Sequence, residues 1–170
     1  MEYTFRKAKT EEQNEIWKIL EDAILRRKKD GSDQWQDGYP NPSVVENDIE
    51  KGNGFVLLDE QENILGYAAI LINYEPEYAN IKGKWITNED FIVMHRVAIS
   101  DQYIGKGLAQ IMLKYMEEYA LSNNIYSIKA DTNFDNAGML KIFEKMGYSY
   151  CGEVTFRGTP RRAFEKVLTK

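Results

Sequence analysis

Two hydrophobic periods alternate along the chain and separate the predicted helices from the predicted strands. Apolar residues three and four apart predict a first helix whose buried stripe consists of Ile16, Ile19, Leu20, Ala23 and Ile24. Thr10-Glu-Glu-Gln13 has the pattern of a capping box, and the basic run 26–29 suits the negative C-terminal end of this helix. Asn41-Pro42 predicts the N-cap and first residue of a shorter helix that stops at Gly52.

Period-two and short apolar runs predict the strands. They cover residues 3–8, 55–58, 64–72, 91–99, 125–130, 148–154 and 163–168. Two further helices follow the strands at 91–99 and 125–130; Asn123-Asn124 ends the first, and Gly147 ends the second. Asp135 or Asn133 is the expected N-cap of the second. Residues 73–90 are interpreted as a loop. The order predicts one mixed α/β sheet with helices on both faces, in a single domain over residues 1–170.

The strand at 91–99 ends in a turn that carries chemistry. Gln102-Tyr-Ile-Gly105-Lys-Gly107 stands between this strand and a helix, where uncovered N–H groups and the helix dipole favour an anion. A P-loop is excluded because Ser100 stands at its first glycine and Gly107 follows the lysine. A Rossmann fingerprint is excluded because Gln110 stands at its third glycine. The turn matches Gln/Arg-x-x-Gly-x-Gly/Ala in full.

That pattern resembles the GNAT superfamily of acetyl-CoA-dependent N-acetyltransferases. A second segment, 133–148, supports the resemblance: an asparagine opens a helix that ends in an aromatic-x-x-x-Gly-aromatic pattern, here Phe143 to Tyr148. The similarity covers nearly the whole chain. It implies a GNAT-like acyl-CoA N-acyltransferase fold with a central, mostly antiparallel sheet. It also implies acetyl-CoA or coenzyme A as co-substrate, with no metal.

The resemblance assigns the donor side of the site. Backbone N–H groups of residues 104–109 would cradle the pyrophosphate, the backbone of the central strand would pair with the pantetheine arm, and Asn133 or Asn136 would hydrogen-bond that arm. Capping of a helix is the alternative role of each asparagine. The expected coenzyme-binding residues are Val97, Ile99, Gln102, Ile104, Gly105, Lys106, Gly107, Leu108, Ala109, Asn133 and Asn136.

The proton-transfer residues are less defined than the donor site. His95, the one histidine, lies two residues before Val97, and an ordinary histidine pKa near 6.5 suits a general base. A core histidine bonded to a carbonyl is the alternative. Many relatives carry a tyrosine as general acid where this chain has Phe143. Tyr148 is therefore the candidate acid, although a thiolate also leaves without help. Cys151, the one cysteine, is interpreted as packing rather than an acetyl carrier.

The acceptor is the open question. Trp35, Tyr39 and Trp85 lie in the two segments that the resemblance assigns to the acceptor, where they would contact an amine by cation–π interaction or simply pack. A small amine, an amino acid, an antibiotic amine and a protein N-terminus or lysine all remain candidates. The leading hypothesis is transfer from acetyl-CoA to a primary amine in a ternary complex. The alternatives are acyl-CoA binding or regulation without turnover, and a structural domain.

The composition and net charge limit the classes of partner that the protein is expected to bind. The net charge of −5 and pI near 5.1 argue against nucleic-acid binding, which requires a clustered basic face. No apolar run reaches the ~20 residues that span a bilayer, and the first residues lack an apolar signal core. The expectation is a cytoplasmic enzyme that does not bind membranes. Pairing through sheet edges is common in the family, so the resemblance also allows a homodimer.

Overall fold

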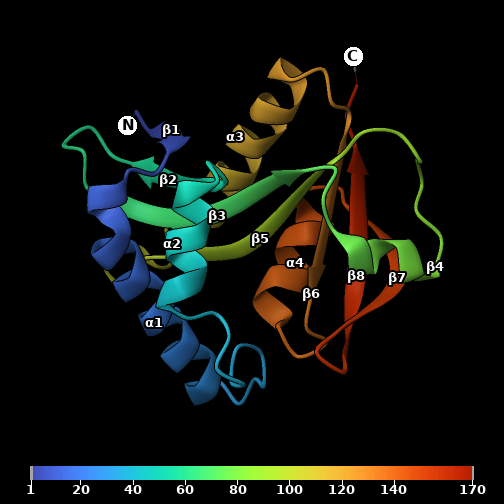
Figure 1. Cartoon of the computed structure of the whole chain (residues 1–170), viewed down its shortest axis with the longest axis horizontal. Helices are drawn as coiled ribbons and strands as arrows, with labels where there is room; N and C mark the ends of the chain where they lie inside the picture. The colour runs from blue at the N-terminus through green and yellow to red at the C-terminus, as the bar shows by residue number, and fades with distance from the viewer. Residues whose placement is uncertain (1, 170) are drawn as a thin grey trace. The chain divides into compact units, whose positions relative to one another are not determined.

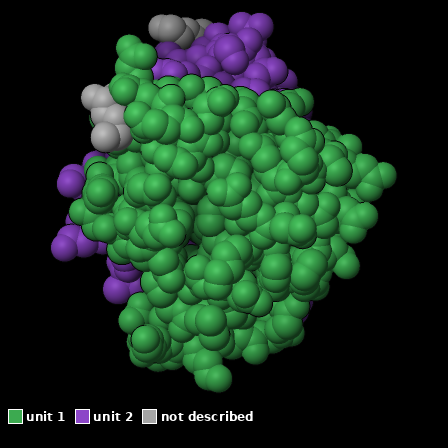
Figure 2. Space-filling model, turned by 90° about the vertical axis from the view of Figure 1, so that its left-hand side faces the viewer, with its two compact units in different colours: residues 1–70, 96–115 green, residues 71–95, 116–170 purple. Residues whose placement is uncertain are grey.

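The computed structural model describes residues 2–169, which divide into two compact units. Unit 1 holds the residues up to Ile70 together with Arg96–Tyr115, and unit 2 holds Leu71–His95 and the residues from Met116 onward. Figure 2 colours the two units separately. The prediction of a single domain over residues 1–170 stays a prediction.

Helices and strands alternate much as the hydrophobic pattern predicts (Figure 1). The α-helices of the described residues are α1 (Gln13–Lys29), α2 (Pro42–Glu50), α3 (Leu108–Ser122) and α4 (Ala137–Lys145). Their strands are β1 (Thr4–Lys7), β2 (Gly54–Leu58), β3 (Ile64–Ile72), β4 (Lys82–Gly83), β5 (Ile92–Ile99), β6 (Ser127–Thr132), β7 (Ser149–Phe156) and β8 (Thr159–Val167). The 3₁₀ turns are η1 (Thr10–Glu12), η2 (Pro76–Asn80) and η3 (Asp101–Tyr103).

The strands follow the order β1-β2-β3-β5-β6-β8-β7-β4. Neighbouring strands run antiparallel in the pairs β1–β2, β2–β3, β6–β8, β7–β8 and β4–β7, whereas β5 and β6 run parallel. The predicted fold class, a mixed sheet that is mostly antiparallel, is confirmed.

In unit 1, the strands are covered by helices on both faces. Val56 and Leu58 of β2 and Tyr67 of β3 belong to the core that α1 and α2 close, as the alternation of a strand requires. The neighbouring positions of β2 face the other way: Phe55 stacks on Phe5, which in turn stacks on Tyr115 of α3. The predicted stripe of α1 lies in the first of these cores, with Ile24 only partly buried.

The capping box before α1 lies one residue earlier than predicted. Lys9 is the N-cap of η1, and the Lys9 N–H donates to Glu12 Oε1 at 2.8 Å. Glu12 also accepts from the Arg6 guanidinium at 2.8 and 3.0 Å, a partner on β1 that the helical pattern did not contain. The prediction of Thr10 and Gln13 was wrong because the helix begins with a 3₁₀ turn.

Glu12→Gln should make the free energy of unfolding less dependent on pH between pH 7 and pH 3. The hydrogen bond from Arg6 lowers the Glu12 pKa in the folded protein, so this carboxylate stabilises the fold above its unfolded pKa and loses that effect as pH falls through the lowered value. We expect Glu12→Gln to cost about 1 kcal/mol near pH 7 and almost nothing near pH 3. Urea denaturation at both pH values measures this. Equal losses for the exposed control Glu15→Gln would contradict it.

In unit 2, β7 and β8 form a long hairpin whose turn residues, Arg157 and Gly158, both have positive φ. The segment 73–90, predicted as a loop, was wrong in part, because it contains η2 and the short edge strand β4. β4 pairs with β7 through the facing glycines Gly83 and Gly152, where a Cβ on Gly83 would lie 2.1 Å from the Cys151 carbonyl oxygen. This close approach explains why a two-residue strand without hydrophobic alternation still pairs.

The N-cap of helix α4 lies one residue after Asp135, the later of the two predicted positions. Asn136, not Asp135 or Asn133, is the N-cap, and its Oδ1 accepts from the Met139 N–H at 3.2 Å. Its end is as predicted: Gly147 has φ +84°, and the Tyr148 N–H donates to the Phe143 carbonyl at 2.9 Å.

Candidate functional site

The glycine turn leaves the beginning of α3 uncovered. Gly105 and Gly107 have φ of +81° and +72°, and a Cβ added to either would meet no atom within 4 Å. Gln102 and Lys106 are exposed beside them. The first N–H groups of an α-helix have no carbonyl partner within the helix. The turn therefore presents backbone donors, a positive dipole end and a lysine to solvent, which together suit a phosphate group.

The end of β5 leads into this turn and is fixed by α1. Arg26 donates from Nη2 to the Ile99 carbonyl at 3.2 Å and pairs through Nη1 with Asp101 of η3. Val97 and Ile99, the predicted partners of the pantetheine arm, are half-buried.

The two asparagines of the second motif differ in their hydrogen bonding. Asn136 caps α4, the role that the sequence left open as an alternative. Asn133 is buried, and its Oδ1 has no hydrogen-bond partner among the described residues. A buried amide oxygen without a donor is energetically costly, so Asn133 is the better candidate for a ligand contact.

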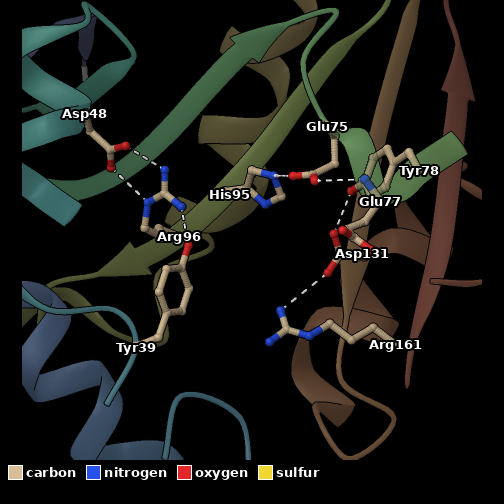
Figure 3. A network of polar contacts seen from close by, with 9 residues as sticks. All are labelled: Tyr39, Asp48, Glu75, Glu77, Tyr78, His95, Arg96, Asp131 and Arg161. Atoms are coloured by element: carbon tan, nitrogen blue, oxygen red, sulfur yellow. Dashed lines mark hydrogen bonds and ion pairs between the residues drawn. The ribbon is translucent and has the colours of Figure 1, made fainter. Parts of the chain in front are cut away.

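In unit 2, His95 forms a carboxylate–imidazole pair with Glu75. Its Nε2 lies 2.8 Å from Glu75 Oε2, and the side chains are 16% and 12% exposed (Figure 3). Glu75 is itself held at the beginning of η2, where its other oxygen accepts from the Glu77 N–H at 3.4 Å. Glu75 was not predicted; its only sequence signal is an acid directly before a proline, the arrangement of an N-cap.

A second polar group in unit 2 centres on Asp131 at the end of β6. Tyr78 donates its hydroxyl to Asp131 Oδ2 at 2.6 Å, and Arg161 Nη1 lies 3.4 Å from Oδ1 (Figure 3). Burial, together with the Asp131 charge, raises the pKa of Tyr78 well above its usual value, so this hydroxyl remains a donor. Phe156 contacts both polar groups, with its ring 6.3 Å from that of Tyr78 and 6.4 Å from that of His95.

A buried ion pair lies in unit 1, next in the chain to His95. Arg96 donates from Nε and Nη2 to the two oxygens of Asp48, at 2.8 and 2.6 Å, and their side chains are 9% and 3% exposed. Tyr67 donates its hydroxyl to Asp48 Oδ2 at 2.7 Å, and Arg96 Nη1 donates to the Tyr39 hydroxyl. Arg96 has φ +53°, an uncommon conformation for a residue with a side chain.

The predicted acceptor aromatics have different surroundings. Trp35 is buried in the core against α1, under the Arg27 guanidinium at 3.8 Å, and burial lowers the pKa of Arg27 to about 10. Trp85 is buried in unit 2 and donates from Nε1 to the Tyr78 carbonyl at 2.9 Å. Tyr39 is only partly buried and accepts from Arg96. Nothing in these contacts assigns any of the three to a substrate.

Tyr148, the candidate acid, is buried in unit 2 against the ring of Phe143. It lies 5.1 Å from the Phe143 ring, and its hydroxyl has no hydrogen-bond partner among the described residues. Burial raises the Tyr148 pKa, with a further contribution from Glu117. Cys151 is also buried, in the cluster with Val93 and Val154, and burial raises its pKa. Both environments favour the protonated side chains.

The family model of the GNAT acetyltransferases matches residues 14–148. The chain belongs to the GNAT acetyltransferase family. It is an acyltransferase, and the matched range includes the glycine turn, His95 and Asn133. Within residues 2–169, this GNAT chain has no helix long and apolar enough to cross a membrane, and no group of three metal-ligating side chains.

Individual relatives agree with the family assignment. An uncharacterized N-acetyltransferase of Bacillus subtilis, YesJ, is 26% identical over 82% of this chain and 76% of its own length. A crystal structure of a GNAT acetyltransferase from Streptococcus agalactiae is 36% identical, with a TM-score of 0.90 over 99% of this chain and 96% of that one. The Salmonella typhimurium yncA structure, solved with its cofactor acetyl-CoA, shares the fold at 16% identity and a TM-score of 0.68 over 100% of this chain and 96% of its own.

Proposed function

We propose that this GNAT chain transfers the acetyl group of acetyl-CoA to a primary amine, by direct attack in a ternary complex. The observation that carries the proposal is the uncovered beginning of α3 after Gln102–Gly107, in a chain of this family. The bound acetyl-CoA of the yncA structure, which has the same fold, supports the choice of donor.

The pyrophosphate of the coenzyme binds at the glycine turn. The N–H groups of Ile104–Ala109 donate to it, and Gln102 and Lys106 stand at its edge. The backbone of Val97 and Ile99 hydrogen-bonds the pantetheine arm as an added strand would. Asn133 Oδ1, which has no partner among the described residues, accepts from an amide N–H of that arm. Asn136 keeps its capping role and contributes to coenzyme binding only by fixing the beginning of α4.

The acceptor must lose a proton before or during its attack on the thioester, because an aliphatic ammonium has a pKa near 10.4. His95 accepts that proton, directly or through water. With Nε2 directed at Glu75, Nδ1 is the ring nitrogen without a hydrogen bond among the described residues, and the Glu75 carboxylate stabilises the imidazolium that forms. A backbone N–H stabilises the developing oxyanion. The thiolate leaves without an obligatory acid, since thiol pKa values lie near 8.5.

Two measurements on the wild-type protein test this function. Acetyl-CoA at 100 times its Kd should stabilise the fold by ~2.7 kcal/mol, which raises the melting temperature measurably. A panel of primary amines should then release coenzyme A thiol. Absence of any melting shift would overturn coenzyme binding altogether. A melting shift without thiol release from any amine would replace the enzyme by the alternative, an acyl-CoA-binding domain.

Gly107→Ala should weaken acetyl-CoA binding by about tenfold or more. The new Cβ would project into the open space beside the N–H groups that bind the pyrophosphate. Alanine at φ +72° also costs about 1 kcal/mol of stability. Gly31→Ala is the matched control, because Gly31 has φ +82° and equally open surroundings. Titration calorimetry with acetyl-CoA compares the two; equal affinities would remove the glycine turn from the donor site.

Tyr148→Phe should leave kcat within about twofold of the wild type and should not lower stability. The hydroxyl is buried without a partner in the part of the chain that the structure describes, and removal of such a group relieves a desolvation penalty of about 1–3 kcal/mol. Thiol release and thermal melting measure the two effects. Loss of turnover with acetyl-CoA binding intact would instead make Tyr148 the general acid.

A further inference from the structure

The Arg161 guanidinium in unit 2 has more donors than its surroundings use. Arg161 is only 9% exposed, yet its one ionic contact among the described residues is the 3.4 Å approach of Nη1 to Asp131 Oδ1. Its Nε is buried with no hydrogen-bond partner among the described residues. Figure 3 shows the side chain reaching past Asp131, with one terminal nitrogen directed away from that carboxylate. A buried guanidinium with five N–H donors normally uses most of them.

Asp131 does not explain the placement of Arg161. The Asp131 carboxylate already accepts a 2.6 Å hydrogen bond from Tyr78, whereas the Arg161 contact exceeds the usual length of a charge-assisted hydrogen bond. Arg96 shows the contrast: its guanidinium binds both oxygens of Asp48 in the bidentate geometry, at 2.6 and 2.8 Å. The Arg161 fork is left available for a second, planar anion.

Arg161 and His95, the proposed base, both lie near the Phe156 ring. The Arg161 guanidinium carbon is 5.4 Å from the centre of the Phe156 ring, and the His95 ring contacts the same phenyl group at 6.4 Å. The polar groups near this ring carry both signs of charge: the Glu75 carboxylate pairs with His95, and the Asp131 carboxylate lies next to the Arg161 guanidinium. The carboxylates favour an ammonium group, and the guanidinium favours a carboxylate.

We propose that the acceptor is a small amino acid, whose carboxylate pairs with Arg161 while its amine faces the His95–Glu75 pair. This inference rests on the proposed acetyltransferase function and specifies its substrate class. A plain amine, a polyamine or the amino terminus of a long peptide carries no carboxylate beside its reactive nitrogen. Such acceptors would leave the Arg161 donors without a partner, which a water-excluding site penalises.

Matched acceptors test the proposal by activity. Each amino acid is compared with its decarboxylated amine and with its carboxamide in the thiol-release assay. The wild type should favour the amino acid in kcat/KM by about 10- to 100-fold over either analogue. Arg161→Gln should remove this preference, mainly through KM, while its activity on the decarboxylated amine stays within about threefold of the wild type. Arg161→Lys should recover part of the preference, since the charge remains but the fork is lost.

Arg162→Gln is the control with the same chemical change one residue along β8. Adjacent strand residues point to opposite faces, and the Arg162 guanidinium stacks over Phe134 at 4.8 Å instead. Arg162→Gln should keep the wild-type preference for the carboxylate. An equal loss in both variants, or equal kcat/KM for amino acid and decarboxylated amine in the wild type, would overturn the assignment of Arg161.

A binding measurement separates this inference from the proposed function. Thermal melting with millimolar amino acids, in the presence of coenzyme A, reports acceptor binding without turnover. Stabilisation by amino acids in the wild type but not in Arg161→Gln would support the carboxylate site even if no thiol were released. Thiol release from plain amines together with no amino-acid stabilisation would keep the acetyltransferase and overturn the amino-acid acceptor.

Discussion

Replacing His95 with glutamine should lower kcat/KM for acetyl transfer by about 10²- to 10⁴-fold, the usual contribution of a general base. The physical reason is the removal of the group that takes the ammonium proton. Glutamine retains a polar side chain that still reaches the Glu75 carboxylate, so the variant should fold. The melting shift with acetyl-CoA should remain as in the wild type.

The pH profile distinguishes this loss from a merely structural one. In the wild type, protonation of the base at low pH removes its acceptor nitrogen, so kcat/KM falls on the acidic side. His95→Gln should flatten that acidic limb, because the group that titrates there is gone. Initial rates of thiol release between pH 5 and pH 9 measure both limbs. An acidic limb unchanged in shape would take His95 out of the proton transfer.

Glu75→Gln should lower the activity less than His95→Gln does. The amide accepts a hydrogen bond from Nε2 as the carboxylate does, but it carries no charge to stabilise an imidazolium. We expect this variant to retain more activity than His95→Gln, because the base itself is still present. Because Glu75 acts on the proton transfer through its 2.8 Å contact with His95 Nε2, kcat should change more than KM for the amine.

Features set by residues close in sequence were predicted well. The ends of α3 and α4 are each followed two residues later by a residue with positive φ, Asn124 and Gly147, and Asn41 caps α2 through its own side chain. The glycine turn was found in the same way, because its glycines and the following helix are contiguous. Such signals depend on backbone preferences within a few residues, which a single sequence contains.

The polar partners could not be predicted, because they are distant in sequence. Glu75 and His95 are separated by 20 residues, Asp48 and Arg96 by 48, and Tyr78 and Asp131 by 53. In the sequence, each of these side chains looks like an ordinary polar surface residue. Only the tertiary fold determines which of them contact one another. Arg96 adds a second reason: nothing in its neighbours indicates a φ of +53°, a conformation that the ion pair with Asp48 helps to hold.

Arg96→Met should lower the free energy of unfolding by about 3–5 kcal/mol. Methionine fills much of the volume of the arginine stem but leaves the Asp48 carboxylate buried without its charge partner, at 3% exposure. Burial by itself lowers the Arg96 pKa, but Tyr39 and Asp48 raise it above its usual value, so the guanidinium is charged wherever the protein is folded. Arg96→Met therefore removes the complete ionic interaction between Arg96 and Asp48. Urea denaturation followed by circular dichroism measures the change.

Arg6→Met is the matched control, since it removes the same group from the more exposed Arg6–Glu12 pair and should cost no more than about 1 kcal/mol. Asp48→Leu added to Arg96→Met should recover part of the loss, because the second change removes the unpaired charge. The Tyr67 hydroxyl then loses its acceptor, which keeps the recovery incomplete. A loss below about 1 kcal/mol for Arg96→Met alone would show that water reaches Asp48 and that this ion pair does not hold β5 against α2.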